Sequence, residues 1–201
     1  MSNSPFNPKY QNDDLSKKVI AGLERISETF KKLLWEQAKQ LKVSPIQIQL
    51  LIFIAYHKPE LCNVSYLAKE FNVTKPTVSD AVRVLNAKGL LQKNFSSSDN
   101  RSYFVELTAL GQSYVEETEH FAKPLQEFFT KKESAELEEL FTTLASLISQ
   151  LNNSGILTVQ RMCYACRFYD SSSNRDYCNL LRKELSPSTI RLDCPEFEEK
   201  L

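Results

Sequence analysis

The chain has 201 residues, of which 42% are hydrophobic, and its 25 lysines and arginines balance 25 aspartates and glutamates. This length fits one core domain with a small appendage better than two full domains. The balanced charge excludes a strong overall field that would attract nucleic acid, so any such attraction must be local. No run of about 18 apolar residues exists, and the first twenty residues lack the apolar segment of a signal peptide. We therefore expect a cytoplasmic protein with no membrane partner.

The N-terminal part is predicted to consist of a flexible arm and two helices. Residues 1–14 form a polar arm with two prolines and too few apolar side chains to order it. From Leu15 to Leu41 the apolar positions step by three or four, which predicts a long amphipathic helix capped by Asp13 or Asp14. A second helix, from Pro45 to about His57, is apolar on several sides, as expected of a helix that is buried by the elements that follow it.

Two helical patterns separated by a short break follow. The first is predicted to run from a Ser65 cap through Phe71, and the second from a Thr74 cap to a stop at Gly89. The second helix has an apolar stripe, formed by Val78, Ala81, Val82 and Leu85. Its opposite face is short, polar and basic near its start, as an element that enters a DNA major groove requires. The residues of this helix expected to contact DNA are Thr74, Lys75, Thr77, Ser79 and Arg83.

Two short strands are predicted next, at 90–95 and 102–107, with a polar loop between them. A helical pair followed by such a hairpin is typical of a winged helix-turn-helix. Between Ser65 and Val105, six cationic residues stand against three anionic ones, a local excess of three positive charges. The positive charge is therefore concentrated where the motif predicts DNA contact.

The segment from Asp99 to Gly111 resembles the wing signature of the MarR family of bacterial transcription regulators. The matching residues are Asp-Asn-Arg at 99–101 and Leu-Thr-Ala-Leu-Gly at 107–111. The resemblance implies that Asp99 orients Arg101 at the wing tip toward the minor groove of DNA. It covers residues 15–151 and implies a mainly α fold with a small β wing, a helical dimerisation region, and a dimer that binds a pseudo-palindromic operator.

The helices after the wing raise the question of what covers their apolar faces. Thr108 is predicted to cap a helix that continues, with a bend before Pro124, to Thr130. A further helix at 134–151 carries a broad apolar stripe. No predicted sheet could cover this stripe or that of the 15–41 helix. We therefore expect a homodimer with interdigitating terminal helices, as the family resemblance implies; the alternative is a self-contained helical core.

The chain changes character at residues 152–155, and residues 156–201 form a cysteine-rich segment. This segment holds four of the five cysteines of the chain within thirty-two residues: Cys163, Cys166, Cys178 and Cys194. Clustered thiols in a cytoplasmic protein more often bind a metal than form disulfides. About forty residues also cannot bury a core unaided, and a metal centre supplies the missing constraint. We therefore predict a four-cysteine metal or cluster module, with a disulfide or an incidental grouping as the alternative.

The order of the cysteines bears on which centre they hold. Structural zinc usually uses two Cys-x-x-Cys pairs, whereas this segment has one pair and two single cysteines. The pattern Cys-x-x-Cys-x-Phe-Tyr, Cys-x-x-Leu and Cys-Pro-x-Phe resembles the cysteine frame of high-potential iron–sulfur proteins, although the spacings differ. Proline directly after the last cysteine, at Pro195, is also common at iron–sulfur sites. The pattern favours an iron–sulfur cluster of the 4Fe–4S type, with zinc as the alternative.

Two classes of function remain open. The first is a dimeric, sequence-specific DNA-binding transcriptional regulator whose cysteine centre senses redox state, iron or an oxidant; a variant of it has a purely structural zinc tail and a small aromatic effector. The second is an electron-transfer or enzymatic cluster protein on a helical scaffold, but nothing in the chain resembles a substrate site, so we expect no enzyme. His57 and His120 are interpreted as solvated surface histidines. Cys62 is interpreted as a partly buried filler rather than a redox-sensing thiol.

Overall fold

The computed structural model describes residues 4–11, 14–95, 103–172 and 175–200. Its helices are α1 (Pro8–Gln11), α2 (Leu15–Leu41), α3 (Pro45–Tyr56), α4 (Val64–Glu70), α5 (Lys75–Ala87), α6 (Ala109–Thr118), α7 (Lys123–Phe129) and α8 (Ser134–Asn153). Its strands are β1 (Leu91–Asn94), β2 (Phe104–Leu107), β3 (Tyr169–Asp170), β4 (Tyr177–Cys178) and β5 (Lys183–Glu184), and its short 3-10 turns are η1 (Pro59–Leu61), η2 (Cys163–Ala165) and η3 (Pro187–Thr189). The predicted mainly α fold with a small β wing is confirmed. A small three-stranded sheet, in the order β3-β4-β5, is added in the C-terminal segment.

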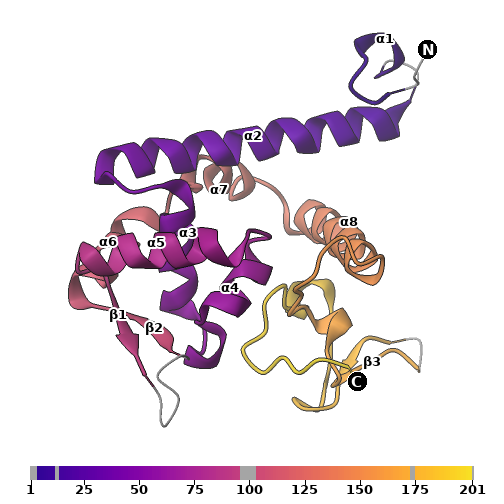
Figure 1. The fold of residues 1–201 in the computed structure, drawn as a ribbon. Helices are drawn as coiled ribbons and strands as arrows, with labels where there is room; N and C mark the ends of the chain where they lie inside the picture. Colours follow the sequence, from indigo (N-terminus) through magenta and orange to yellow (C-terminus); the bar gives the residue numbers. More distant parts are fainter. Residues whose placement is uncertain (1–3, 12–13, 96–102, 173–174, 201) are drawn as a thin grey trace.

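The N-terminal helix α2 has the predicted length and start. The side chain of Asp14 accepts a hydrogen bond from the backbone N–H of Ser16 at 2.9 Å, so Asp14 is the helix cap. Part of the predicted arm is ordered, because residues 8–11 form the single helical turn α1. Figure 1 shows α2 as a long rod along one side of the molecule, above helices α3 to α8. No helix in the described part of the chain is both long and apolar enough to span a membrane.

The main apolar core holds α3, the helix-turn-helix and the base of the wing together. Helix α3 is apolar on all sides and packs against α2, α5, α6 and β2. The most deeply buried side chains of this core are Leu50, Leu51, Leu67, Val78, Val82, Leu85, Val105 and Val115. Burying such side chains contributes roughly 1.5–3 kcal/mol each, so this core fixes the orientation of α4 and α5 relative to the rest of the domain.

Helix α4 begins two residues earlier than predicted. Asn63, not Ser65, is its cap, since the side chain of Asn63 accepts a hydrogen bond from the backbone N–H of Tyr66 at 3.0 Å. Ser65 therefore lies inside the first turn. The turn after α4 is made at Asn72, whose φ of 51° is in the left-handed region that asparagine tolerates.

Helix α5 follows the prediction closely. The side chain of Thr74 accepts from the backbone N–H of Thr77 at 3.3 Å, and Gly89, with a φ of 70°, stops the helix. The four residues of the predicted apolar stripe are all buried. Strands β1 and β2 then pair antiparallel, with Leu91 opposite Leu107. The predicted wing tip, including Asp99 and Arg101, lies outside the described residues.

The helices after the wing leave apolar surface uncovered in the single chain. Thr108 caps α6, as predicted, by accepting from the N–H of Gly111 at 3.0 Å. The predicted helix to Thr130 is divided into α6 and α7. On α2, the side chains of Val19, Leu23, Ile26 and Phe30 are 36–54% exposed. The helices of one chain therefore do not cover the apolar stripe of α2. Uncovered apolar surface of this kind is expected at a subunit interface.

The cysteine-rich segment packs against α8. Ala145 of α8 is buried together with Met162, Cys163, Leu185 and Ile190 of the segment. Phe141 and Ile148, one turn to either side of Ala145, pack against the same cluster. In Figure 1 the segment lies below α8 and beside α4. The C-terminal segment therefore shares a small core with the last long helix.

Candidate DNA-binding face and cysteine site

The five residues of α5 predicted to contact DNA all lie on its exposed side. Thr74, Lys75, Thr77, Ser79 and Arg83 are exposed, while the opposite side of the helix is buried. The guanidinium of Arg83 forms an exposed ion pair with Asp80 at 3.1 Å, which is worth little in water and costs little to exchange for a phosphate. The hydroxyls of Thr74 and Thr77 lie 2.8 Å apart. The polar face of α5 is therefore accessible, and the buried apolar stripe on the other side of the helix fixes α5 in the core.

All four cysteines of the C-terminal segment line one small cavity of about 20 Å³. Cys163 begins the η2 turn and Cys166 follows it, and both are buried, whereas Cys178 on β4 and Cys194 are half-buried. The remaining walls are largely apolar and include Phe168, Tyr169, Leu180, Leu181 and Leu185. All five cysteines of the chain are free thiols. Cysteines that are up to 31 positions apart in the sequence are thus brought to one water-poor place.

Arg191 supplies two hydrogen bonds to sulfur in this cavity. Its backbone N–H donates to Cys163 Sγ at 3.2 Å, and its guanidinium donates to Cys194 Sγ at 3.5 Å. Burial raises the pKa of the Cys163 thiol, and the N–H of Arg191 acts in the opposite direction. Hydrogen bonds from N–H groups stabilise negative charge on sulfur, the form in which cysteine binds metals. Among the described residues, no group of three or more His, Cys, Asp or Glu side chains is placed to hold a metal ion.

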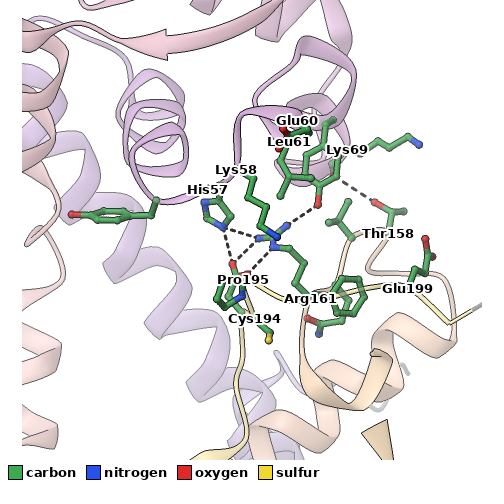
Figure 2. A pocket seen from close by; sticks show the side chains of 16 residues that line it. His57, Lys58, Glu60, Leu61, Lys69, Thr158, Arg161, Cys194, Pro195 and Glu199 are labelled. Atoms are coloured by element: carbon green, nitrogen blue, oxygen red, sulfur yellow. Dashed lines mark hydrogen bonds and ion pairs between the residues drawn. The ribbon is translucent and has the colours of Figure 1, made fainter. Parts of the chain in front are cut away.

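A second cluster of side chains, which the sequence did not reveal, joins this segment to the helix-turn-helix. Its centre is Arg161, whose guanidinium donates to Glu70 at 2.6 and 3.2 Å and to the hydroxyl of Tyr66 at 2.9 Å, both on α4. The same guanidinium donates to Asp193 of the C-terminal segment through two bonds of 2.7 Å. Figure 2 shows Arg161 at the centre of the part of this network that lines the adjoining cavity.

His57 belongs to the same network, so its interpretation as a solvated surface histidine was wrong. Its side chain is only 18% exposed, and its Nε2 lies 2.9 Å from Asp193 Oδ2. Its ring stacks on Phe53 at 3.7 Å between centroids, and its Nδ1 lies 2.8 Å from the Phe53 carbonyl. His120, by contrast, is exposed as predicted. The partner of His57 is 136 positions away, and nothing local in the sequence indicated it.

The charges of this network stabilise one another. Burial alone would lower the pKa of Arg161, but its hydrogen bonds to Asp193, Glu70 and Tyr66 outweigh this and raise that pKa above its ordinary value. Burial would likewise raise the pKa of Asp193, but hydrogen bonds from Arg161 and His57 hold it well below its ordinary value. Both groups are therefore charged at neutral pH.

A cavity of about 710 Å³ lies beside the network, between the helix-turn-helix and the C-terminal segment. Figure 2 shows the residues that line it, with His57, Lys58 and Lys69 on one side and Thr158, Arg161 and Cys194 on the other. Cys194 lines both this cavity and the smaller cysteine cavity. The remaining cysteine, Cys62, is 1% exposed within the main core. This burial agrees with its interpretation as a small side chain that fills space in the core.

A capped recognition helix with an exposed polar face, followed by a two-stranded hairpin, defines a winged helix-turn-helix protein. Residues 41–102 match the model of the MarR family. A comparison with curated proteins finds no significant match. Among solved structures, the MepR–DNA complex of Staphylococcus aureus is 25% identical, covers 64% of this chain and 95% of its own, and has a TM-score of 0.56.

Two further structures share the fold at lower identity. MepR of Staphylococcus aureus in its DNA-binding conformation is 23% identical, with a TM-score of 0.58 over 66% of this chain and 98% of its own. MarR of the same species, in complex with salicylate and kanamycin, is 19% identical, with a TM-score of 0.60 over 71% and 96%. Residues 41–102 thus resemble the MarR family, and 64–71% of the chain shares the winged helix-turn-helix fold of the MepR and MarR structures.

Proposed function

We propose that this protein is a cytoplasmic homodimer that binds a pseudo-palindromic DNA operator and carries a sensory four-cysteine centre in its C-terminal segment. The single observation that carries the DNA-binding part is the exposed polar face of α5 on a family-matching helix-turn-helix. The MepR structure with 25% identity is a DNA complex, which supports the same role here.

The operator is read by two copies of α5 in successive major grooves, about one helical turn apart. Lys75, Thr77, Ser79 and Arg83 share the contacts with base edges and phosphates, and Thr74 lies at the helix start, where N–H groups can face a phosphate. Arg101 enters the flanking minor groove, where Asp99 fixes its guanidinium. Because the chain has no net charge, the chain as a whole does not attract DNA. The electrostatic attraction to the phosphates therefore comes from the local basic face.

The test of DNA binding uses a duplex selected by the wild-type protein from a random-sequence pool. Lys75→Ala and Arg101→Ala are each expected to weaken binding by about 1–3 kcal/mol, measured by fluorescence anisotropy at physiological salt. Lys39→Ala, which removes an exposed cation from α2, is the matched control and should leave affinity unchanged. Unchanged affinity in both test variants would remove α5 and the wing from the model.

The four-cysteine centre is proposed to be an iron–sulfur cluster that reports redox state, iron or an oxidant. Its support is the convergence of four thiols on one apolar cavity, with N–H donors aimed at two of the sulfurs. A structural zinc site usually has two Cys-x-x-Cys pairs, whereas this segment has one such pair, at Cys163 and Cys166. Pro195 directly after the last cysteine is also common at iron–sulfur sites, so the order of the cysteines favours the cluster.

The test of the centre is the visible spectrum and metal content of protein purified without oxygen. A cluster predicts a brown protein with iron and sulfide, and Cys194→Ser should lose them. Cys62→Ala is the matched control, because Cys62 is buried in another core, and it should keep them. Colourless protein with one zinc per chain would favour the alternative of a structural zinc tail and a small aromatic effector. Full metal retention in Cys194→Ser would show that the four-cysteine site is wrong.

A further inference from the structure

We propose that Arg161 and Asp193 couple the four-cysteine centre to α4, so that the state of the centre sets the position of the helix-turn-helix. The inference rests on the proposed centre and names the route by which it regulates DNA binding. The observation that carries it is a partly buried ionic network whose two halves belong to different parts of the fold.

On the side of the centre, both bridging residues are tied directly to cysteines. Asp193 immediately precedes Cys194, and Arg161 lies two residues before Cys163. The backbone N–H of Cys194 donates to the carbonyl of Arg161 at 3.1 Å, and Arg161 pairs with Asp193 as a parallel bridge. A change in the positions of Cys163 and Cys194 therefore displaces both bridging residues.

On the DNA-binding side, the network ends on α4. Arg161 contacts Glu70, the last residue of α4, and Tyr66, one turn earlier. The hydroxyl of Thr158 also lies 3.5 Å from the carbonyl of Lys69. Helix α4 packs against α5 through the main core, where Leu67 and Ala68 are buried with the α5 stripe. Because cores of this density do not deform continuously, a displaced α4 carries α5 with it.

The side of the network that faces α4 is shielded from water. The side chain of Arg161 is 10% exposed and that of Glu70 is 19% exposed, whereas that of Asp193 is 45% exposed. Breaking such a pair leaves a charge in a poorly solvated place, so the pair is either formed or replaced by a different arrangement. The ion pair between Arg167 and Glu198 is about half exposed on both sides and is screened by water. Arg167 also follows a cysteine, but its ion pair in the described part of the chain is with Glu198 of the same segment, so Arg167 serves as a comparison.

The experiment compares operator affinity with the centre loaded and after anaerobic removal of the metal by a chelator. It uses the full chain and the duplex selected by the wild-type protein. The wild type is expected to differ about 5- to 100-fold between the two states, the usual range of coupling between sites. Glu70→Gln and Arg161→Met should reduce this ratio to roughly twofold or less, with the visible spectrum unchanged. Arg167→Gln is the matched control and should keep the wild-type ratio.

A second measurement does not depend on the metal. In the metal-free protein, Glu70→Gln should speed amide hydrogen exchange at residues 158–161 and 190–194, because the network no longer holds this segment against α4. Unchanged exchange there, or a wild-type ratio in both test variants, would overturn the coupling. Equal affinity of the two wild-type states would overturn it too, while leaving DNA binding and the centre intact. Wild-type protein without bound metal would instead overturn the proposed centre and the coupling with it.

Discussion

The backbone carbonyl oxygen of Leu90 occupies the space that a Cβ atom at Gly111 would need. The start of the wing and the first turn of α6 can therefore approach only because residue 111 has no side chain. Gly111→Ala should destabilise the fold by about 1–3 kcal/mol, the usual cost of overpacking, even though alanine favours helices. Urea unfolding measures this change.

The control for this prediction is Gly22→Ala on α2, where an added methyl meets nothing within 4 Å in the chain. There the helix preference of alanine should stabilise the protein by about 0.5–1 kcal/mol. Equal effects of the two substitutions on the urea midpoint would contradict the close contact at Leu90.

The uncovered stripe of α2 predicts the outcome of placing charge in the subunit interface. Ile26→Glu should split the dimer, because the interface would desolvate a carboxylate without a partner. Operator affinity should fall with it, since one subunit makes about half the phosphate contacts. Lys32, whose side chain is 77% exposed, lies on the opposite side of α2, so Lys32→Glu should leave the dimer intact in sedimentation analysis. A wild-type protein that sediments as a monomer at micromolar concentration would refute the interface.

The cap of the recognition helix is open to a direct test. Thr74→Ala removes the side-chain oxygen that accepts from Thr77 N–H and should cost about 1 kcal/mol of unfolding free energy. Thr74→Ser keeps that oxygen and should recover most of the loss. Thermal unfolding of both variants measures the effect, and an equal loss in serine and alanine variants would show that the cap does not act through its oxygen.

The buried thiol of Cys62 predicts both a reactivity and a pH dependence. Burial, with smaller contributions from Glu60 and Glu106, raises the pKa of Cys62 to about 11 from its ordinary value of 9.0. Because the folded state holds the proton more tightly than the unfolded chain, stability should fall as pH rises from about 9 to about 11. At neutral pH, iodoacetamide should modify Cys62 only after unfolding. In Cys62→Ala this part of the alkaline loss of stability should disappear.

Much of the winged helix-turn-helix part could be predicted from the sequence because its signals are local. The apolar spacing of α2 and α5, and the caps at Asp14, Thr74 and Thr108, act over a few residues each. The start of α4 was misplaced for the same reason. Asn63 and Ser65 are both competent caps two positions apart, and only the packing of the first turn selects Asn63.

The network around Arg161 could not be predicted, because its partners are distant in the sequence and each looks like an ordinary solvated charge. Arg161 and Glu70 are 91 positions apart, and the fold of the C-terminal segment brings them together. The grouping of the four cysteines was anticipated from their density, since a short segment needs a shared constraint. Their role as ligands stays a prediction, as does the role of α5 and of Arg101 in binding DNA.

The position of the cysteines after α8 has a consequence for newly made molecules. Helices α2 to α8 precede Cys163, and chains fold from the N-terminus during synthesis at about 5–20 residues per second. The recognition helix therefore forms before the last cysteine leaves the ribosome. Each newly synthesised molecule is at first without its proposed cofactor. The proportion of loaded molecules in a growing cell then depends on how fast the cofactor is inserted compared with how fast new chains are made. Rapid synthesis alone would shift the population toward the unloaded form.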